Sequence, residues 1–170
     1  MMKVIIYCAV TLNGKIARGQ SDPLDWTTKE DKGIFAIETK KAGVVVMGHN
    51  TFNSISHPLK DRLNVVLTLK DKDSENLPGF LEYTCQTPKQ ILETLKRRGF
   101  KKVFVIGGSV INTLFLRAGL VDEIWLTLAP RLFGDGISLV TDEHLEKKLN
   151  LLSAKKLAEG FIMVKYEVVK

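Results

Sequence analysis

One stretch of the chain that reads as a helix carries an acidic side chain among less polar neighbours. In WTTKEDKGIFAIET, residues 26–39, the residues Asp31, Phe35 and Thr39 follow one another at four-residue intervals. Residues four apart share one face of a helix, so this carboxylate is expected where its neighbours indicate burial. Burial disfavours an ionised carboxylate, whereas the N-terminus of a helix favours it. A group balanced in this way can couple ligand binding to proton transfer.

A helix cap offers a structural explanation of the same acid. Thr28 is a plausible N-cap, because its hydroxyl can accept a hydrogen bond from a free amide of the first turn. Asp31 then stands at the third helical position, where a capping-box acid belongs. The cap explains an acid at this position but not the face that it shares with Phe35 and Thr39. Spacing alone favours the cap.

Two further stretches carry groups suited to phosphate binding. VVVMGHNTF (residues 44–52) and VFVIGGSVI (residues 103–111) each run from a buried strand through glycine into a helix start. Free amides and closely approaching backbone are typical of phosphate sites. Either turn alone is weak evidence, since the three-glycine Rossmann spacing is missing. Together they indicate a ligand with two phosphate-bearing segments, such as a dinucleotide. The candidate residues are Gly48, His49, Asn50, Thr51, Gly107, Gly108 and Ser109.

Alternating strands and helices must position these groups. Hydrophobic periodicity predicts helices at 28–41, from about 50, at 88–98 and at 109–119, and a polar loop at 70–79. It predicts strands at 4–10, 44–47, 63–69, 81–84, 101–108, 121–130 and 160–169. This order indicates a three-layer α/β fold, with a mostly parallel twisted central sheet, helices on both faces and an antiparallel C-terminal edge. We expect residues 1–170 to form a single domain.

Composition excludes several classes of function. Cys8 and Cys85 are far apart among 170 residues, which indicates neither a disulfide framework nor a metal site and fits a reducing cytoplasm. The apolar N-terminal run is too short to span a membrane. The formal net charge of +6 is scattered, which favours solvated helix faces over nucleic-acid binding. A nucleic-acid binder and a non-catalytic nucleotide-binding module remain as alternatives from other classes.

Several of these segments resemble the dihydrofolate reductase family, over most of the chain. WTTKEDKGIFAIET resembles the first long helix of that family, and VVVMGHNTFNSISHPLKDRLNVVLT resembles its strand, cofactor-binding helix start and return strand. VFVIGGSVI and DEIWLTLAPRLFGDG resemble its glycine pair and late strands. The joint spacing of Trp26, Asp31, Phe35, Thr51 and Arg62 is specific, whereas the glycine pair belongs to a wider superfamily.

The resemblance implies NADPH-dependent reduction of 7,8-dihydrofolate to tetrahydrofolate. Asp31 would grip two adjacent donors of the pterin, a water near Trp26 would supply the proton, and Thr127 would orient the carboxylate. Phe35 and Ile55 would enclose the ring, and Arg62 would bind the glutamate tail. The residues implied around NADPH are Gly48, His49, Asn50, Thr51, Thr68, Lys70, Gly107, Gly108, Ser109 and Val110. From the residues alone, Thr127 reads equally well as a strand threonine, Phe35 and Ile55 as core residues, and Arg62 as a surface arginine.

Other segments resemble the riboflavin-pathway reductases, sister enzymes of the same fold. TLNGKIA matches their first loop better than that of the folate enzymes, and AGLVDEIWLTLAPRLFGDG is common to both branches. The alternative substrate is therefore a ribosylated aminopyrimidine. GIFAIETKKA lacks the histidine and arginine that the sister branch uses for a ribose phosphate, so dihydrofolate is the favoured prediction. His49 stands where an arginine is usual, and Asn112 where a tyrosine is common. The resemblance is compatible with a monomer or a homodimer.

Overall fold

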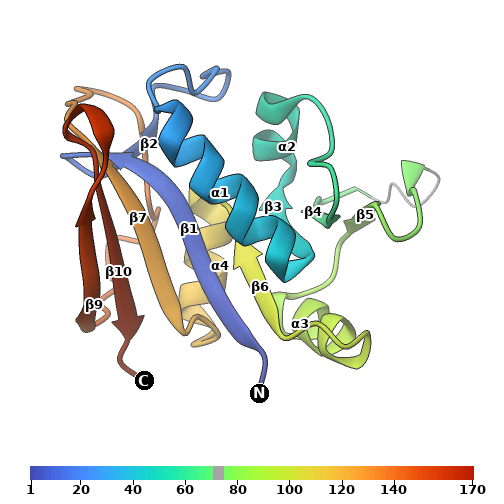
Figure 1. Cartoon of the computed structure of the whole chain (residues 1–170). Helices are drawn as coiled ribbons and strands as arrows, with labels where there is room; N and C mark the ends of the chain where they lie inside the picture. The colour runs from blue at the N-terminus through green and yellow to red at the C-terminus, as the bar shows by residue number, and fades with distance from the viewer. Residues whose placement is uncertain (71–74) are drawn as a thin grey trace.

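The computed structural model describes residues 1–70 and 75–170, and within them it contains one eight-stranded sheet flanked by helices (Figure 1). The strand order is β5-β4-β3-β6-β1-β7-β10-β9. The strands are β1 (Lys3–Thr11), β3 (Val44–Gly48), β4 (Leu63–Leu67), β5 (Leu81–Thr84), β6 (Lys102–Val105), β7 (Glu123–Ala129), β9 (Leu149–Lys156) and β10 (Ile162–Val168). The helices are α1 (Lys29–Ala42), α2 (His49–Ile55), α3 (Pro88–Arg97) and α4 (Ser109–Arg117).

Strand direction confirms the predicted fold class. β1 runs parallel to β6 and β7, and β3 runs parallel to β4 and β6, so the carboxyl ends of these strands meet at one edge of the sheet. β10 is antiparallel to both β7 and β9 and forms the antiparallel C-terminal edge. Parallel strands need crossover connections, which the helices provide. That shared edge is where both glycine turns begin.

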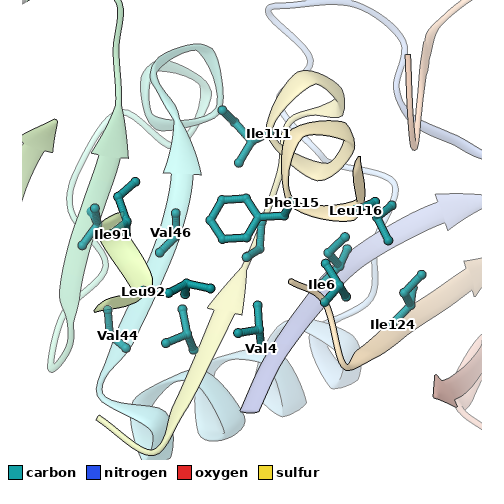
Figure 2. Close-up of a cluster of buried hydrophobic side chains, with 14 of the residues drawn as sticks. Val4, Ile6, Val44, Val46, Ile91, Leu92, Ile111, Phe115, Leu116 and Ile124 are labelled. Atoms are coloured by element: carbon teal, nitrogen blue, oxygen red, sulfur yellow. The ribbon is translucent and has the colours of Figure 1, made fainter. Parts of the chain in front are cut away.

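Two hydrophobic layers fix the helices on the sheet. Alternate residues of β1 point to opposite faces, as strand geometry requires. Figure 2 shows the layer in which Ile6 of β1 packs with Phe115 and Leu116 of α4 and with Leu92 of α3. The other layer includes Tyr7 and receives α1 and α2. Figure 1 shows α1 lying across the sheet on one side and α4 behind it.

Three strands were not predicted from the sequence. β2 (Lys15–Ala17) and β8 (Ile137–Ser138) form a separate two-stranded ribbon and are too short to show periodicity. All eight residues of β9 are exposed, so its sequence lacks the alternation that identifies a half-buried strand. The strand predicted at 63–69 ends at Leu67, because its neighbour β5 ends at Thr84, which pairs with Leu67. The loop predicted at 70–79 includes residues 71–74, which lie outside the described residues.

Candidate active site

Asp31 occupies the first turn of α1, and the predicted cap holds that turn. Thr28 is the N-cap, and its hydroxyl accepts a hydrogen bond from the Asp31 amide at 3.1 Å. This bond uses the backbone of Asp31 and leaves its side chain free to turn towards the sheet. The cap and a functional carboxylate are therefore compatible at one residue.

The Asp31 carboxylate is buried against β7. Its residue is 6% exposed, and Thr127, which is fully buried, donates a hydrogen bond to Oδ1 at 2.6 Å. Oδ2 accepts no hydrogen bond from the part of the chain that the structure describes. Burial raises the pKa of Asp31, and the Thr127 hydroxyl and the Lys32 charge oppose that rise. The structure thus brings the predicted pair together and leaves one carboxylate oxygen available to a ligand.

Aromatic rings surround this carboxylate. Trp26 is 2% exposed and packs edge-on against Phe133, with ring centroids 5.4 Å apart. Its indole Nε1 finds no hydrogen-bond partner among the described residues. Phe35 lies one helical turn after Asp31 and meets Tyr7 edge-on at 5.3 Å. Ile55 of α2 packs into the same layer, as does Phe35.

The sequence-based analysis missed Tyr7 and Phe133. Tyr7 lies inside KVIIYCAVT, a nearly continuous buried strand in which a tyrosine looks like any other large core residue. Phe133 follows β7, where no periodicity marks it. Its ring also carries the Arg18 guanidinium, 5.4 Å from the centroid. Arg18 and Phe133 therefore cover the Trp26 side of the site.

Burial, and not a surface hollow, distinguishes the Asp31 region. Two surface hollows lie elsewhere, one beside Arg117 and Asp142 and one beside Phe100 and Lys101. Those hollows carry neither the buried carboxylate nor the unpaired indole. We assign function to the Asp31 region because unpaired buried polar atoms, rather than surface shape, gather there.

Arg62 is buried, which rules out the surface arginine that the sequence left open. Its Nε donates to the carbonyl of Lys60 at 2.9 Å, and its Nη1 donates to the Thr39 hydroxyl. Nη2 makes no hydrogen bond with the residues that the structure describes. Burial lowers the pKa of Arg62. Asp31 and Thr39 share one face of α1. This face carries the carboxylate at its N-terminal end and binds the Arg62 guanidinium through Thr39 at its C-terminal end.

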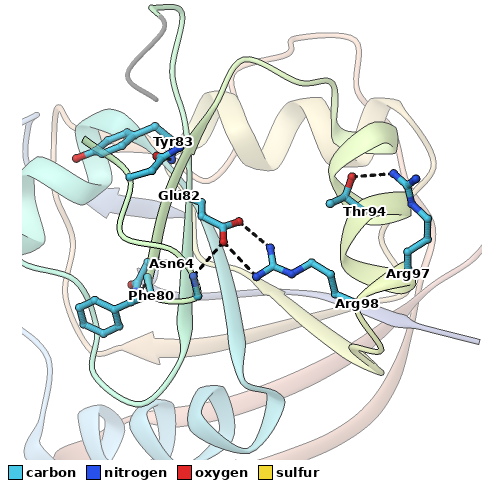
Figure 3. Close-up of polar contacts among 9 residues, drawn as sticks. Asn64, Phe80, Glu82, Tyr83, Thr94, Arg97 and Arg98 are labelled. Carbon is cyan, nitrogen blue, oxygen red and sulfur yellow. Dashed lines mark hydrogen bonds and ion pairs between the residues drawn. The ribbon is translucent and has the colours of Figure 1, made fainter. Parts of the chain in front are cut away.

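A buried amide positions the loop that presents Arg62. Asn64 is fully buried, and its Nδ2 donates to the carbonyls of Arg62 at 3.0 Å and Phe80 at 3.1 Å. Its Oδ1 accepts from the Leu59 amide at 2.9 Å. Figure 3 shows Asn64 beside Phe80 at the start of β5. These bonds fix the backbone of residues 59–62 against two strands.

The two glycine turns form one continuous backbone surface. The Gly48 amide donates to the Gly107 carbonyl at 2.8 Å, and Gly48 leads into α2 as Gly108 leads into α4. A Cβ on Gly48 would lie 2.9 Å from Ile111 Cγ1, and one on Gly108 would lie 3.3 Å from Thr51 Oγ1. The peptide bond between Gly107 and Gly108 is cis. The first turn of α4 has no side-chain cap, which leaves its amides available to an anion.

The other residues predicted to bind the cofactor differ in their exposure and in the hydrogen bonds that they already make. Ser109 donates its hydroxyl to the Ser138 carbonyl of β8, so a contact of Ser109 with the cofactor would use its backbone amide. His49 is half-buried, with Nδ1 at 3.4 Å from Asn53 Nδ2. Asn50, Lys70 and Val110 are exposed, whereas Thr51 and Thr68 are half-buried. Thr68 and Lys70 follow β4, at the same sheet edge as the turn after β3.

Asn112, at the position where a tyrosine is common, lies in the interior of the protein. It is fully buried and donates to the Leu139 carbonyl at 3.0 Å. This bond and the Ser109 bond both tie α4 to the chain around β8. The ribbon of β2 and β8 therefore supports the turn at Gly107 and Gly108.

Gly136→Ala is expected to destabilise this ribbon. Gly136 has φ +146°, and a Cβ there would lie 2.6 Å from the Ala17 carbonyl oxygen. Backbone strain and the clash should lower the free energy of unfolding by about 1.5 kcal/mol, measured by urea denaturation. Gly134→Ala is the matched control, because nothing lies within 4 Å of a Cβ there. Equal losses in both variants would contradict the expectation.

No group of histidine, cysteine and acidic residues in the described ranges could hold a metal ion. Among the same residues, no helix is long and apolar enough to cross a bilayer.

Comparison with known proteins identifies a family that this chain matches and solved structures that share its fold. The model of the RibD C-terminal domain family matches residues 2–163. A putative dihydrofolate reductase of Caenorhabditis elegans is 31% identical, over 75% of this chain and 71% of that protein. A putative riboflavin biosynthesis protein from Shewanella sp. PV-4 superposes with a TM-score of 0.84 at 22% identity, covering 99% of this chain and 100% of that one.

A bifunctional relative has the same fold within a longer chain. It is the diaminohydroxyphosphoribosylaminopyrimidine deaminase/5-amino-6-(5-phosphoribosylamino)uracil reductase of Thermotoga maritima, with a TM-score of 0.81 at 19% identity. The match covers 99% of this chain but 57% of that protein. These structural likenesses establish the fold, and the family match establishes an oxidoreductase-type family. The chain belongs to the RibD C-terminal domain family, which has the dihydrofolate reductase-like fold.

Proposed function

We propose that this protein is an NADPH-dependent reductase whose substrate presents a 2-amino-4-oxopyrimidine edge to Asp31. The observation that carries the proposal is the buried carboxylate, held by Thr127 through one oxygen and free at the other. A buried carboxylate is retained only when a partner compensates its desolvation. A 2-amino group beside a ring N–H supplies two parallel donors, which suit a carboxylate.

The same chemistry selects among pyrimidines. A uracil edge offers one N–H between two carbonyl oxygens, and either oxygen would face the Asp31 carboxylate unfavourably. A 2-aminopyrimidin-4-one replaces one of those oxygens with a donor. The proposed substrate therefore keeps its 2-amino group, unlike the uracil named for the Thermotoga relative.

A ribosylated aminopyrimidine of riboflavin synthesis is the first candidate substrate. The family match and the riboflavin-related structural neighbours support this candidate better than they support a folate. In this substrate, opening of the ribose ring gives a C=N bond next to the pyrimidine. Reduction adds a hydride to its carbon and a proton to its nitrogen.

Dihydrofolate is the second candidate, because a specific observation favours it. Arg62 is buried at the far end of the α1 face that carries Asp31, and its Nη2 makes no hydrogen bond with the described residues. A guanidinium with a free edge suits a carboxylate such as the glutamate tail of a folate. Here too a C=N bond of the ring takes up hydride and a proton.

The residues around the two glycine turns fit the proposed cofactor. Gly48 and Gly108 lie so close to Ile111 and Thr51 that side chains there would fill the turn, and the first amides of α4 are uncapped. NADPH, when bound, supplies the hydride. Gly107, Gly108 and the start of α4 would hold one phosphate-bearing segment, and His49, Thr51, Thr68 and Lys70 the other.

Proton supply falls to the buried end of the site. A raised pKa lets Asp31 exchange a proton with bound substrate more readily than an exposed aspartate would. The unpaired Trp26 Nε1 can orient a water between the indole and the carboxylate. Arg18 and Phe133 would exclude bulk water once the substrate is seated.

His49→Arg tests the cofactor assignment. Arginine adds a fixed charge and a bidentate donor at the start of α2, so preference for NADPH over NADH should rise about tenfold, as the ratio of kcat/KM values. His57→Arg adds the same charge at an exposed position and should leave the preference unchanged. An equal effect of both variants would mean that position 49 does not contact the 2′-phosphate.

The direct test of function follows NADPH oxidation by absorbance. The purified protein is supplied with the ribosylated 2-aminopyrimidin-4-one, its uracil counterpart or dihydrofolate. We expect turnover with at least one of the two substrates that carry the 2-amino group, and little with the uracil. Turnover of the uracil alone would overturn the proposed role of Asp31.

A further inference from the structure

Tyr7 places a hydroxyl group inside the same site. It lies on β1 in register with Trp125 of β7, and Ala9 is in register with Thr127. Because residues two apart share a face of a strand, Tyr7 and Thr127 point to the same side of the sheet, beneath α1. The tyrosine is 2% exposed, and its ring contacts Phe35, Phe104 and Trp125 at centroid distances of 5.3–5.9 Å.

The phenol oxygen of Tyr7 has no hydrogen-bond partner among the described residues. The Thr127 hydroxyl lies near it but gives its proton to Asp31, and the two hydroxyls do not meet the geometry of a hydrogen bond. A buried polar group without a partner costs about 1–3 kcal/mol. Phenylalanine at this position would avoid that cost, so packing of the fold does not account for the hydroxyl.

The hydroxyl remains a neutral donor over a wide pH range. Burial, followed by the nearby Asp31 charge, raises the pKa of Tyr7, and the Thr127 hydroxyl opposes the rise only in part. The site consequently pairs an acceptor, the free oxygen of Asp31, with a donor, the hydroxyl of Tyr7. Both belong to the face of the sheet covered by α1.

We infer that Tyr7 is a specificity-determining residue whose hydroxyl donates a hydrogen bond to the 4-oxo oxygen of the substrate ring. The inference rests on the proposed function and extends it. A 2-amino-4-oxopyrimidine presents two donors followed by one acceptor along a single edge. Asp31 receives the two donors, and Tyr7 supplies the donor that the 4-oxo oxygen requires.

Access to the hydroxyl involves Phe35. Of the three rings around Tyr7, Phe104 and Trp125 are buried in the core, whereas Phe35 is only half-buried. Phe35 also lies one helical turn from Asp31, on the same face of α1. A planar ring that displaces Phe35 towards solvent would meet Asp31 and Tyr7 together.

The test compares Tyr7→Phe with the wild type, using one ligand that carries the 4-oxo oxygen and one that does not. Pterin carries the 4-oxo oxygen, whereas 2-aminopteridine lacks both that oxygen and the N3–H and keeps the 2-amino group. Each ligand is therefore compared with itself, as the ratio of its dissociation constants in the variant and the wild type. Dissociation constants are measured by fluorescence in the presence of NADP⁺. Tyr7→Phe should weaken pterin binding about tenfold, the loss of one hydrogen bond, and should leave 2-aminopteridine binding unchanged. Tyr166→Phe, on the opposite face of the sheet, is the matched control and should change neither constant.

A second measurement separates this role from a structural one. Because the hydroxyl is unpaired, Tyr7→Phe should keep or raise the free energy of unfolding of the ligand-free protein. Unchanged pterin affinity, equal losses for both ligands or a less stable variant would each overturn the inference while leaving the proposed function standing. If the wild type binds neither ligand, the proposed function fails and the inference fails with it.

Discussion

Asp31→Asn is expected to lower kcat/KM about 1,000-fold while the fold and cofactor binding persist. Asparagine keeps an oxygen that can accept the Thr127 hydrogen bond, and the backbone bond to Thr28 does not involve the side chain. The variant loses the negative charge that pairs with two ring donors and assists protonation, a contribution of the size that enzymes gain from such groups. Steady-state NADPH oxidation measures the loss.

Two accompanying measurements make this test decisive. Residual activity should rise as pH falls, because solvent protons replace the missing group. NADPH affinity, measured by fluorescence, should stay near that of the wild type. Near-normal turnover in the variant would remove Asp31 from the mechanism and leave the helix cap as its role.

The same substitution should change how stability depends on pH. The folded-state pKa of Asp31 is raised, so the unfolded chain releases this proton at lower pH than the folded protein does. Wild-type stability is therefore lost as pH rises from the unfolded pKa towards the folded one. Asparagine does not ionise, so Asp31→Asn should gain stability relative to wild type across that window and keep the gain above it.

Arg62→Leu is expected to raise KM for dihydrofolate about 30-fold, the value of a charged, bidentate contact near 2 kcal/mol. A dihydropterin without the glutamate tail has no group for Arg62, so its KM should change little. Comparing the two substrates isolates the tail contact from damage to the fold. Equal losses for both substrates would make Arg62 structural.

A structural contribution is also expected in this variant, and it needs its own control. Leucine cannot donate to the Thr39 hydroxyl or the Lys60 carbonyl, so the free energy of unfolding should fall. Arg98→Leu removes a guanidinium that binds Glu82 through two bonds of 2.7 and 3.1 Å at a more exposed position, shown in Figure 3. It should cost less stability and leave both KM values unchanged. If wild type reduces the ribosylated pyrimidine but no folate, Arg62 has no tail to bind and the first candidate substrate is supported.

Sequence reasoning predicted the elements whose signals are local. The start of α1 was predictable, because Thr28 and Asp31 stand three residues apart, and both glycine turns follow buried strands directly. The pairing of Asp31 with Thr127 spans 96 residues, and only the family resemblance predicted it. The structure confirms that contact, whereas its chemical role stays a prediction.

Features that depend on packing between distant segments were not predictable. The sequence places Ser109 at a helix start, but it does not show that β8, 29 residues away, accepts the hydrogen bond of its hydroxyl. Arg62 reads as a surface residue until Thr39 and Lys60 enclose it. From the sequence, Tyr7 is an ordinary core residue, because the pattern of a buried strand does not show whether a side-chain hydroxyl has a hydrogen-bond partner. In each case the deciding contact comes from another element.

The exposed strand β9 has a consequence for handling the protein at high concentration. A strand at the end of a sheet offers backbone donors and acceptors to any extended chain that approaches it. Lys155 and Lys156 protect one end of β9, because lysine at a sheet edge discourages further pairing. Leu149, Leu151 and Leu152 are exposed by 37%, 58% and 51% and lie between this pair and a second exposed lysine pair, Lys147 and Lys148. The lysine pairs at both ends of β9 should therefore keep its exposed leucines from pairing with other chains at ordinary concentrations.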